Sequence, residues 1–143
     1  MEEEIKSLVA QLEDKKQDTI GGIDFYSGTI NGKEVVLTRS GIGKVQAGVT
    51  TGLLIANYKV DAVINSGSAG GIGEGLHVGD VVLSTGAAYH DADATAFGYK
   101  PGQLPQQPQI YTADKDLLEA ISKAAKESNL VAKEGLIVTG DQF

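Results

Sequence analysis

A run of small residues from Asn65 to Gly73 holds the residue types that best suit a ligand site. It directly follows the apolar run from Val60 to Ile64. Glycine has no Cβ, so its backbone N–H groups can approach a ligand closely, and a serine hydroxyl adds a donor and acceptor that can reach a sugar. Open α/β sheets bind ligands at the carboxyl ends of their strands. The segment therefore indicates a binding loop, and a glycine-rich surface turn is the alternative.

Titratable residues at two places could do acid–base chemistry. Residues 2–4 are all glutamate, but acidic residues in a first helical turn are also favoured by the helix dipole, so surface charge is the alternative for each. His90 lies beside Asp91 and near Asp93, which suits a general acid or a metal ligand. A lone histidine beside acidic residues is more often an ordinary hydrogen-bonded side chain, so we expect a structural or interface role for His90. The spacing matches no recognised ligand pattern, so we expect no metal.

Periodicity and turn residues predict the elements that must position these groups. The Asn31-Gly32 pair supplies the positive φ angles of a two-residue hairpin turn. The segment 44–64 reads as a helix followed by a strand, which favours a β-α-β unit with parallel pairing. In the first half of the chain we expect a helix over 2–12, hairpin strands over 23–30 and 33–39, a helix over 44–58 and a strand over 60–64. In the second half we expect a strand over 78–84, which continues or exits through 93, and then a long ordered loop to 111. A helix over 113–128, capped by Thr112, and a strand over 133–139 follow.

Composition is typical of a globular protein and excludes several classes. The chain has 143 residues, 41% hydrophobic and 22% charged, so we expect residues 1–143 to form one α/β domain. Its 12 basic and 19 acidic residues give a net charge of −7, with Arg39 as the only arginine, so nucleic acid and membrane surfaces are poor candidate partners. Without cysteine, disulfides and catalytic thiols are excluded. The acidic start and the lack of a long apolar run favour a cytoplasmic protein.

Motifs along the whole chain carry a resemblance to a known family. In order, they are Met1-Glu2-Glu3-Glu4, Ser40-Gly41-Ile42-Gly43-Lys44, Asn65-Ser66-Gly67-Ser68-Ala69-Gly70-Gly71, Val78-Gly79-Asp80-Val81-Val82, Tyr89-His90-Asp91-Ala92-Asp93, Thr95-Ala96-Phe97-Gly98-Tyr99, Gly102-Gln103-Leu104-Pro105 and Gly135-Leu136-Ile137-Val138-Thr139-Gly140-Asp141. Together they resemble the bacterial 5′-methylthioadenosine/S-adenosylhomocysteine nucleosidases of the purine nucleoside phosphorylase superfamily. The resemblance implies a three-layer α/β/α sandwich with a mixed central sheet, incomplete in this chain.

The resemblance also implies an activity. Members of this family hydrolyse the N-glycosidic bond of methylthioadenosine and S-adenosylhomocysteine and release adenine and the thioribose, a step of methionine salvage. The implied partner is thus a small adenine nucleoside, with no metal and no organic cofactor. The implied assembly is a homodimer in which a loop of one subunit closes the site of the other.

Particular residues match the functional positions of the family. Glu4 matches the general base that activates water, which leaves Glu2 and Glu3 as surface charge. The other matched residues are those that contact the nucleoside, Ile42, Ser68, Ala69, Gly70 and Phe143, and those of the partner subunit's alkylthio pocket, Phe97 and Pro105. For Phe97 the alternative is that its ring anchors its own loop.

The chain departs from the family pattern at both ends. The catalytic acid of the family is an aspartate that follows a serine on a late strand, and this chain has no counterpart of it. The first strand of the family also has no counterpart here, so we expect a segment of a longer protein.

One alternative is a nucleoside phosphorylase, in which Arg39 would help to hold phosphate. Lys44-Val45 stands where phosphorylases tend to have Pro-Ser, which favours hydrolysis. The other alternative is a nucleoside-binding protein without catalysis.

Overall fold

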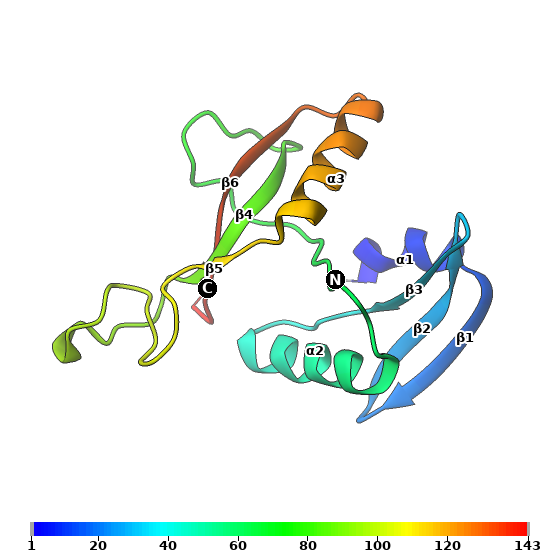
Figure 1. The fold of residues 1–143 in the computed structure, drawn as a ribbon, viewed down its shortest axis with the longest axis horizontal. Coiled ribbons are helices and arrows are strands. Elements are labelled where there is room, and N and C mark those ends of the chain that lie inside the picture. The colour runs from blue at the N-terminus through cyan, green and yellow to red at the C-terminus, as the bar shows by residue number, and fades with distance from the viewer. Residues whose placement is uncertain (1, 143) are drawn as a thin grey trace. The chain divides into compact units, whose positions relative to one another are not determined.

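The computed structural model describes residues 2–142, which form two compact units that divide between Ala69 and Gly70. The first unit contains α1 (Glu2–Ala10), β1 (Glu13–Ile20), β2 (Ile23–Ile30), β3 (Lys33–Thr38) and α2 (Lys44–Tyr58). The second contains β4 (Val81–Tyr89), the 3₁₀ helix η1 (Thr95–Phe97), β5 (Tyr111–Thr112), α3 (Lys115–Glu127) and β6 (Ala132–Thr139) (Figure 1).

The first unit is built on the antiparallel sheet β1-β2-β3. The predicted hairpin is confirmed, with Asn31 at φ 50° and Gly32 at φ 76° in the turn between β2 and β3. The ring of Phe25 in β2 is fully buried and lies 5.4 Å from the ring of Tyr58 in α2. The hydroxyl of Tyr58 donates a hydrogen bond of 3.0 Å to Asp18 of β1. These contacts hold α2 against the sheet.

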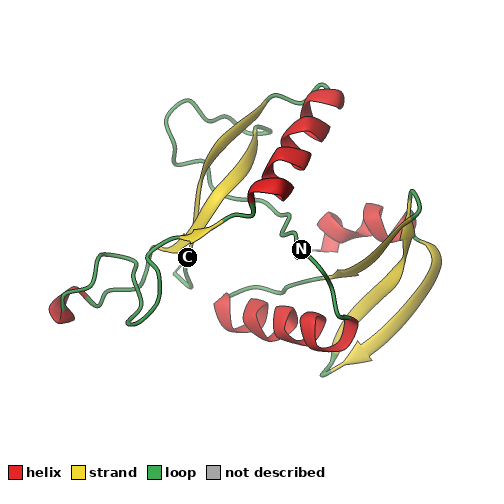
Figure 2. Ribbon diagram, viewed as in Figure 1, coloured by secondary structure: helices red, strands yellow, loops and turns green. Residues whose placement is uncertain are grey.

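The second unit is built on a mixed sheet in the order β5-β4-β6. β4 is parallel to β6 and antiparallel to the short strand β5. The connection between the parallel strands contains α3, which packs against both of them (Figure 2). Leu83 and Ala88 of β4 and Ala125 of α3 are buried. A parallel pair joined through a helix is the β-α-β arrangement, and it brings the carboxyl ends of β4 and β6 to one edge.

The predicted strand over 60–64 is wrong. The structure assigns no strand there, and Val63 and Ile64 are 43% and 62% exposed. An apolar run indicates a tendency to be buried, but a strand also needs a hydrogen-bonded neighbour, and the described residues supply none to this segment. The expected β-α-β unit, with the strand over 33–39, the helix over 44–58 and the strand over 60–64, is therefore wrong as well. The parallel pair is that of β4 and β6.

The start of α3 also differs from the prediction. Thr112 belongs to β5, and the helix is capped instead by Asp114, whose Oδ1 accepts a hydrogen bond of 2.9 Å from the backbone N–H of Leu117. Both residues are good N-caps by type. Pairing of Tyr111 and Thr112 with β4 keeps this part of the chain extended and moves the helix start towards the C-terminus.

Candidate functional site

Glu4 and Ser68 meet in the first unit, although 64 positions separate them in the sequence. Glu4 is half-buried in the first turn of α1. Its Oε1 accepts one hydrogen bond of 3.1 Å from the backbone N–H of Ser68 and another of 3.1 Å from the Ser68 hydroxyl. A Cβ at Gly67 would lie 3.7 Å from the same oxygen. The structure thus brings together the residues predicted as a general base and a hydroxyl near the sugar.

The hydrogen bonds on Glu4 favour its ionised form. The pKa of Glu4 lies below its ordinary value, first because the amino terminus of the chain hydrogen-bonds the carboxylate. The backbone N–H of Ser68 and then its hydroxyl lower the pKa further, whereas desolvation acts in the opposite direction. Donors to a carboxylate stabilise its charged form. Glu4 is therefore a carboxylate at neutral pH and can accept a proton.

Ile42 and Ala69 are surface residues of the first unit. Ile42 lies in the loop between β3 and α2, and its side chain is 74% exposed. This loop is fixed to α2 through Thr50, which is buried and whose Oγ1 donates a hydrogen bond of 3.3 Å to the carbonyl of Ser40. Ala69 is exposed directly after Ser68. An exposed isoleucine on a fixed loop can offer apolar surface to a ligand.

The remaining predicted residues belong to the second unit. The carbonyl of Gly70 accepts a hydrogen bond of 3.1 Å from the N–H of Ile72, which makes a tight turn in the glycine-rich segment. Phe97 ends η1 and is 82% exposed, so it does not bury its own turn as a loop anchor would. Pro105 is exposed in the same loop. Phe143 lies outside the described residues.

The loop between β4 and β5 is ordered by internal hydrogen bonds. Asp93 accepts bonds of 2.9 Å from the N–H and 2.6 Å from the hydroxyl of Thr95, which begin η1. The hydroxyl and then the N–H of Thr95 hold the pKa of Asp93 below its ordinary value. Gly102 donates its N–H to the carbonyl of Ala92 at 2.9 Å. Figure 2 shows η1 at the end of this loop that lies away from the sheet of the second unit. The loop therefore presents Phe97 as a fixed apolar projection.

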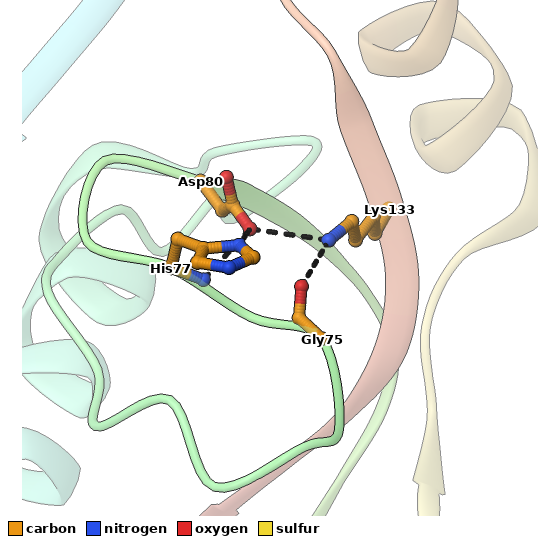
Figure 3. Close-up of polar contacts among 4 residues, drawn as sticks. All are labelled: Gly75, His77, Asp80 and Lys133. Carbon is orange, nitrogen blue, oxygen red and sulfur yellow. Dashed lines mark hydrogen bonds and ion pairs between the residues drawn. The ribbon is translucent and has the colours of Figure 1, made fainter.

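A cluster around Lys133 was not predicted from the sequence. Figure 3 shows Lys133 of β6 donating hydrogen bonds of 2.7 Å to the carbonyl of Gly75 and 3.1 Å to Oδ2 of Asp80. The N–H of His77 donates to the same Oδ2 at 2.9 Å. First this N–H and then Lys133 lower the pKa of Asp80. The cluster closes segment 75–80 against β6. A separation of 53 positions gives no local signal for it.

A shallow apolar hollow lies at the carboxyl ends of β4 and β6. Its volume is about 200 Å³, and its lining residues are Ala87, Ala88, Tyr89, Tyr111 and Thr139. The rings of Tyr89 and Tyr111 meet edge to face, with centroids 6.3 Å apart. Ligand pockets usually enclose about 300–1,000 Å³, so this hollow by itself accommodates only part of a nucleoside.

The described residues contain neither a metal-binding cluster nor a membrane-spanning helix. Over residues 2–142, no group of three or more His, Cys, Asp or Glu side chains is arranged to hold a metal ion. No helix in this part of the chain is both long and apolar enough to cross a membrane.

The second unit has a mixed sheet with a parallel β4–β6 pair, and in the first unit a carboxylate is hydrogen-bonded to a glycine-rich segment. Comparison with known families identifies the class: the phosphorylase superfamily matches residues 1–143, so the chain belongs to the phosphorylase superfamily. Within that class it is similar to the 5′-methylthioadenosine/S-adenosylhomocysteine nucleosidase of Staphylococcus aureus strain JH9. The two are 48% identical over 143 residues, which are 100% of this chain and 63% of that protein.

Solved structures agree with this placement. The nucleosidase of Neisseria meningitidis, crystallised with methylthio-immucillin-A, matches with a TM-score of 0.97 and 48% identity over 100% of this chain and 62% of that one. The nucleosidase of Colwellia psychrerythraea 34H in complex with adenine matches with a TM-score of 0.95 and 45% identity over 100% of this chain and 60% of that one. The resemblance and the phosphorylase-like α/β fold class are confirmed. The chain spans less than two thirds of the length of these relatives.

Proposed function

We propose that the full-length protein hydrolyses the N-glycosidic bond of 5′-methylthioadenosine and S-adenosylhomocysteine and releases adenine and the thioribose. The observation that carries the proposal is the pair of hydrogen bonds from Ser68 to Oε1 of Glu4. It is supported by 48% identity to a nucleosidase with this double specificity in its name. The proposal extends to a cytoplasmic homodimer that acts in methionine salvage.

Glu4 has the chemistry needed to activate water. In hydrolysis, the water oxygen bonds to the anomeric carbon of the ribose while the bond from that carbon to the adenine nitrogen breaks. The carboxylate of Glu4 takes one proton from the attacking water. The Ser68 hydroxyl donates a hydrogen bond of 3.1 Å to the same carboxylate, which supports a proposed contact of this hydroxyl with the water or the ribose. A general acid must protonate the departing adenine, and we assign that role to no residue of this chain.

The other matched residues have supporting roles in this proposal. The 82% exposure of Phe97 supports its part in a neighbouring subunit's pocket, since the described residues leave most of its ring uncovered. An apolar wall suits a methylthio group because it removes apolar surface from water. The proposed nucleoside contacts are Ile42, Ser68, Ala69, Gly70 and Phe143, and the proposed contacts to the partner's alkylthio group are Phe97 and Pro105.

The test is the release of free adenine from methylthioadenosine by the full-length product of the gene that encodes this chain, measured by chromatography. We expect release in phosphate-free buffer and no increase on adding phosphate. Glu4→Gln keeps the size of the side chain but removes the base, so we expect a fall in kcat of at least about 100-fold. Glu3→Gln is the matched control, because Glu3 is exposed on the same helix, and we expect activity near wild type.

The outcomes separate the alternatives. Release only in the presence of phosphate would identify a nucleoside phosphorylase. Binding of methylthioadenosine in calorimetry without release in either buffer would identify a nucleoside-binding protein. Activity of Glu4→Gln within about tenfold of wild type would contradict the assignment of the base. Sedimentation of the same sample tests the homodimer.

A further inference from the structure

Segment 61–69, which contains Ser68, has little structure of its own to hold it in the first unit. It follows α2, and the structure assigns it neither helix nor strand. Every residue from 61 to 69 is exposed. Within residues 2–142, the hydrogen bonds that join this segment to another element are the two from Ser68 to Oε1 of Glu4. Because ordering a segment costs conformational entropy, its order depends largely on these two bonds.

Glu4 belongs to a helix that is itself fixed to the sheet of the first unit. Just after the end of α1, the N–H of Leu12 donates a hydrogen bond of 3.2 Å to the carbonyl of Val9. The side chain of Leu12 then packs on Gly28 of β2, where an added Cβ would lie 3.3 Å from Leu12 Cδ2 and 2.5 Å from the carbonyl oxygen of Glu13. Glycine, which has no Cβ, admits this close approach. The chain between α1 and β1 is thus held against β2, and Glu4 lies on a fixed helix.

We propose that Glu4 is also a positioning residue, which anchors segment 61–69 to α1 through Ser68. One oxygen of its carboxylate accepts hydrogen bonds from both the backbone N–H and the hydroxyl of Ser68, each of 3.1 Å. Hydrogen bonds to a charged acceptor are about twice as strong as neutral ones. This role goes beyond the proposed function, in which Glu4 acts on the attacking water. The same carboxylate thus serves as the base and holds the serine hydroxyl beside itself.

The anchor also affects the affinity for the nucleoside, and this consequence rests on the proposed function, in which Ser68 and Ala69 contact that ligand. A segment that is docked for only part of the time binds more weakly, because the apparent dissociation constant is the intrinsic one divided by the docked fraction. Glu4→Leu removes the acceptor at a similar side-chain size and releases the segment. Glu4→Gln keeps an acceptor oxygen without the charge, so the segment stays docked for more of the time.

The exchange rate of the Ser68 amide hydrogen measures the anchor directly, because this N–H is one of the two donors. Relative to wild type, we expect exchange about 30-fold faster in Glu4→Leu and about fivefold faster in Glu4→Gln. Both variants lack the base, so calorimetry measures their binding of methylthioadenosine without turnover. Glu4→Leu should bind it at least about threefold more weakly than Glu4→Gln.

The experiment uses the full-length protein and its variants. NMR follows hydrogen exchange of the Ser68 amide, which does not depend on activity, and calorimetry gives the dissociation constant of methylthioadenosine. Glu3→Leu is the matched control, because Glu3 is exposed on the same helix, and it should leave both the Ser68 exchange rate and adenine release unchanged. Circular dichroism checks that each variant is folded. If Glu4→Leu does not fold, Glu4→Ala takes its place, with the same expected order of exchange rates and affinities.

The outcomes distinguish this inference from the proposed function. Equal exchange of the Ser68 amide in wild type and in both Glu4 variants overturns the anchor, while adenine release by the wild type still supports the proposed function. Faster exchange in Glu4→Leu with equal affinities of the two Glu4 variants overturns the positioning role as well. A wild type that releases no adenine overturns the proposed function, whereas exchange that is fastest in Glu4→Leu, intermediate in Glu4→Gln and slowest in wild type still supports the anchor.

Discussion

Phe25 is the residue on which the packing of the first unit depends most. Its side chain is fully buried, and its ring lies 5.4 Å from that of Tyr58 at an interplanar angle of 36°. This contact joins β2 to α2, and α2 directly follows the loop that carries Ile42. We therefore predict that Phe25→Ala destabilises the protein strongly.

The expected size follows from the burial. A phenylalanine side chain buries about 150–250 Å², and at about 25 cal/mol per Å² this corresponds to about 4–6 kcal/mol. Alanine keeps part of that burial, and a cavity remains where the ring was, so we expect a loss of about 4 kcal/mol in the free energy of unfolding. This is a large share of the roughly 5–15 kcal/mol that stabilises an ordinary domain.

Urea denaturation of the full-length protein, followed by circular dichroism, measures this loss as a shift of the midpoint. Phe25→Leu keeps most of the buried volume, so it should cost less than about 1.5 kcal/mol. Val78→Ala, at a fully exposed position, should cost less than about 0.5 kcal/mol. A loss below about 1 kcal/mol for Phe25→Ala, or equal losses for the two Phe25 variants, would refute the reasoning.

Two further predictions concern the second unit. Asp114 caps α3, so Asp114→Ala should lower the free energy of unfolding by about 1 kcal/mol, whereas Thr112→Ala should change it by less than about 0.5 kcal/mol in the same urea assay. The pKa of Asp80 is lowered by the N–H of His77 and then by Lys133, so its contribution to stability is complete above the ordinary aspartate pKa of about 3.9. That contribution is lost as the pH falls through the lowered pKa, and Asp80→Asn should remove this dependence in unfolding measured from about pH 6 to pH 2.

Strand β1 shows why part of the fold could not be predicted from the sequence. Its residues, Glu13–Ile20, are mostly charged or polar, and all except Ile20 are exposed. A strand with this composition has no apolar alternation to reveal it. It forms because β2 offers hydrogen-bonding partners at the edge of the sheet, and charged residues are well suited to such an edge. Only the tertiary pairing makes this segment a strand.

Segment 60–64 is the reverse case, a strand that was predicted but is absent. Its apolar residues predicted a strand, yet no strand among the described residues pairs with it. Part of the candidate site was predicted from the sequence and part was not. Glu4 and Ser68 were identified as candidates because their motifs resemble those of a family, and in the structure the Ser68 hydroxyl lies 3.1 Å from Oε1 of Glu4. The hydrogen bonds of Asp91 to Asp141 and of Lys133 to Asp80 were not predicted, because each joins residues at least 50 positions apart.

The sequence by itself determined the features that depend on neighbouring residues. The Asn31-Gly32 hairpin turn, the helix α2 and the strand β6 follow from local backbone preferences and from periodicity, which act over a few positions. Only the tertiary structure decided which distant groups meet. The bonds from Ser68 to Glu4 and from Asp141 to Asp91 exist because packed elements bring together groups that are far apart in the chain, and no local preference encodes that proximity.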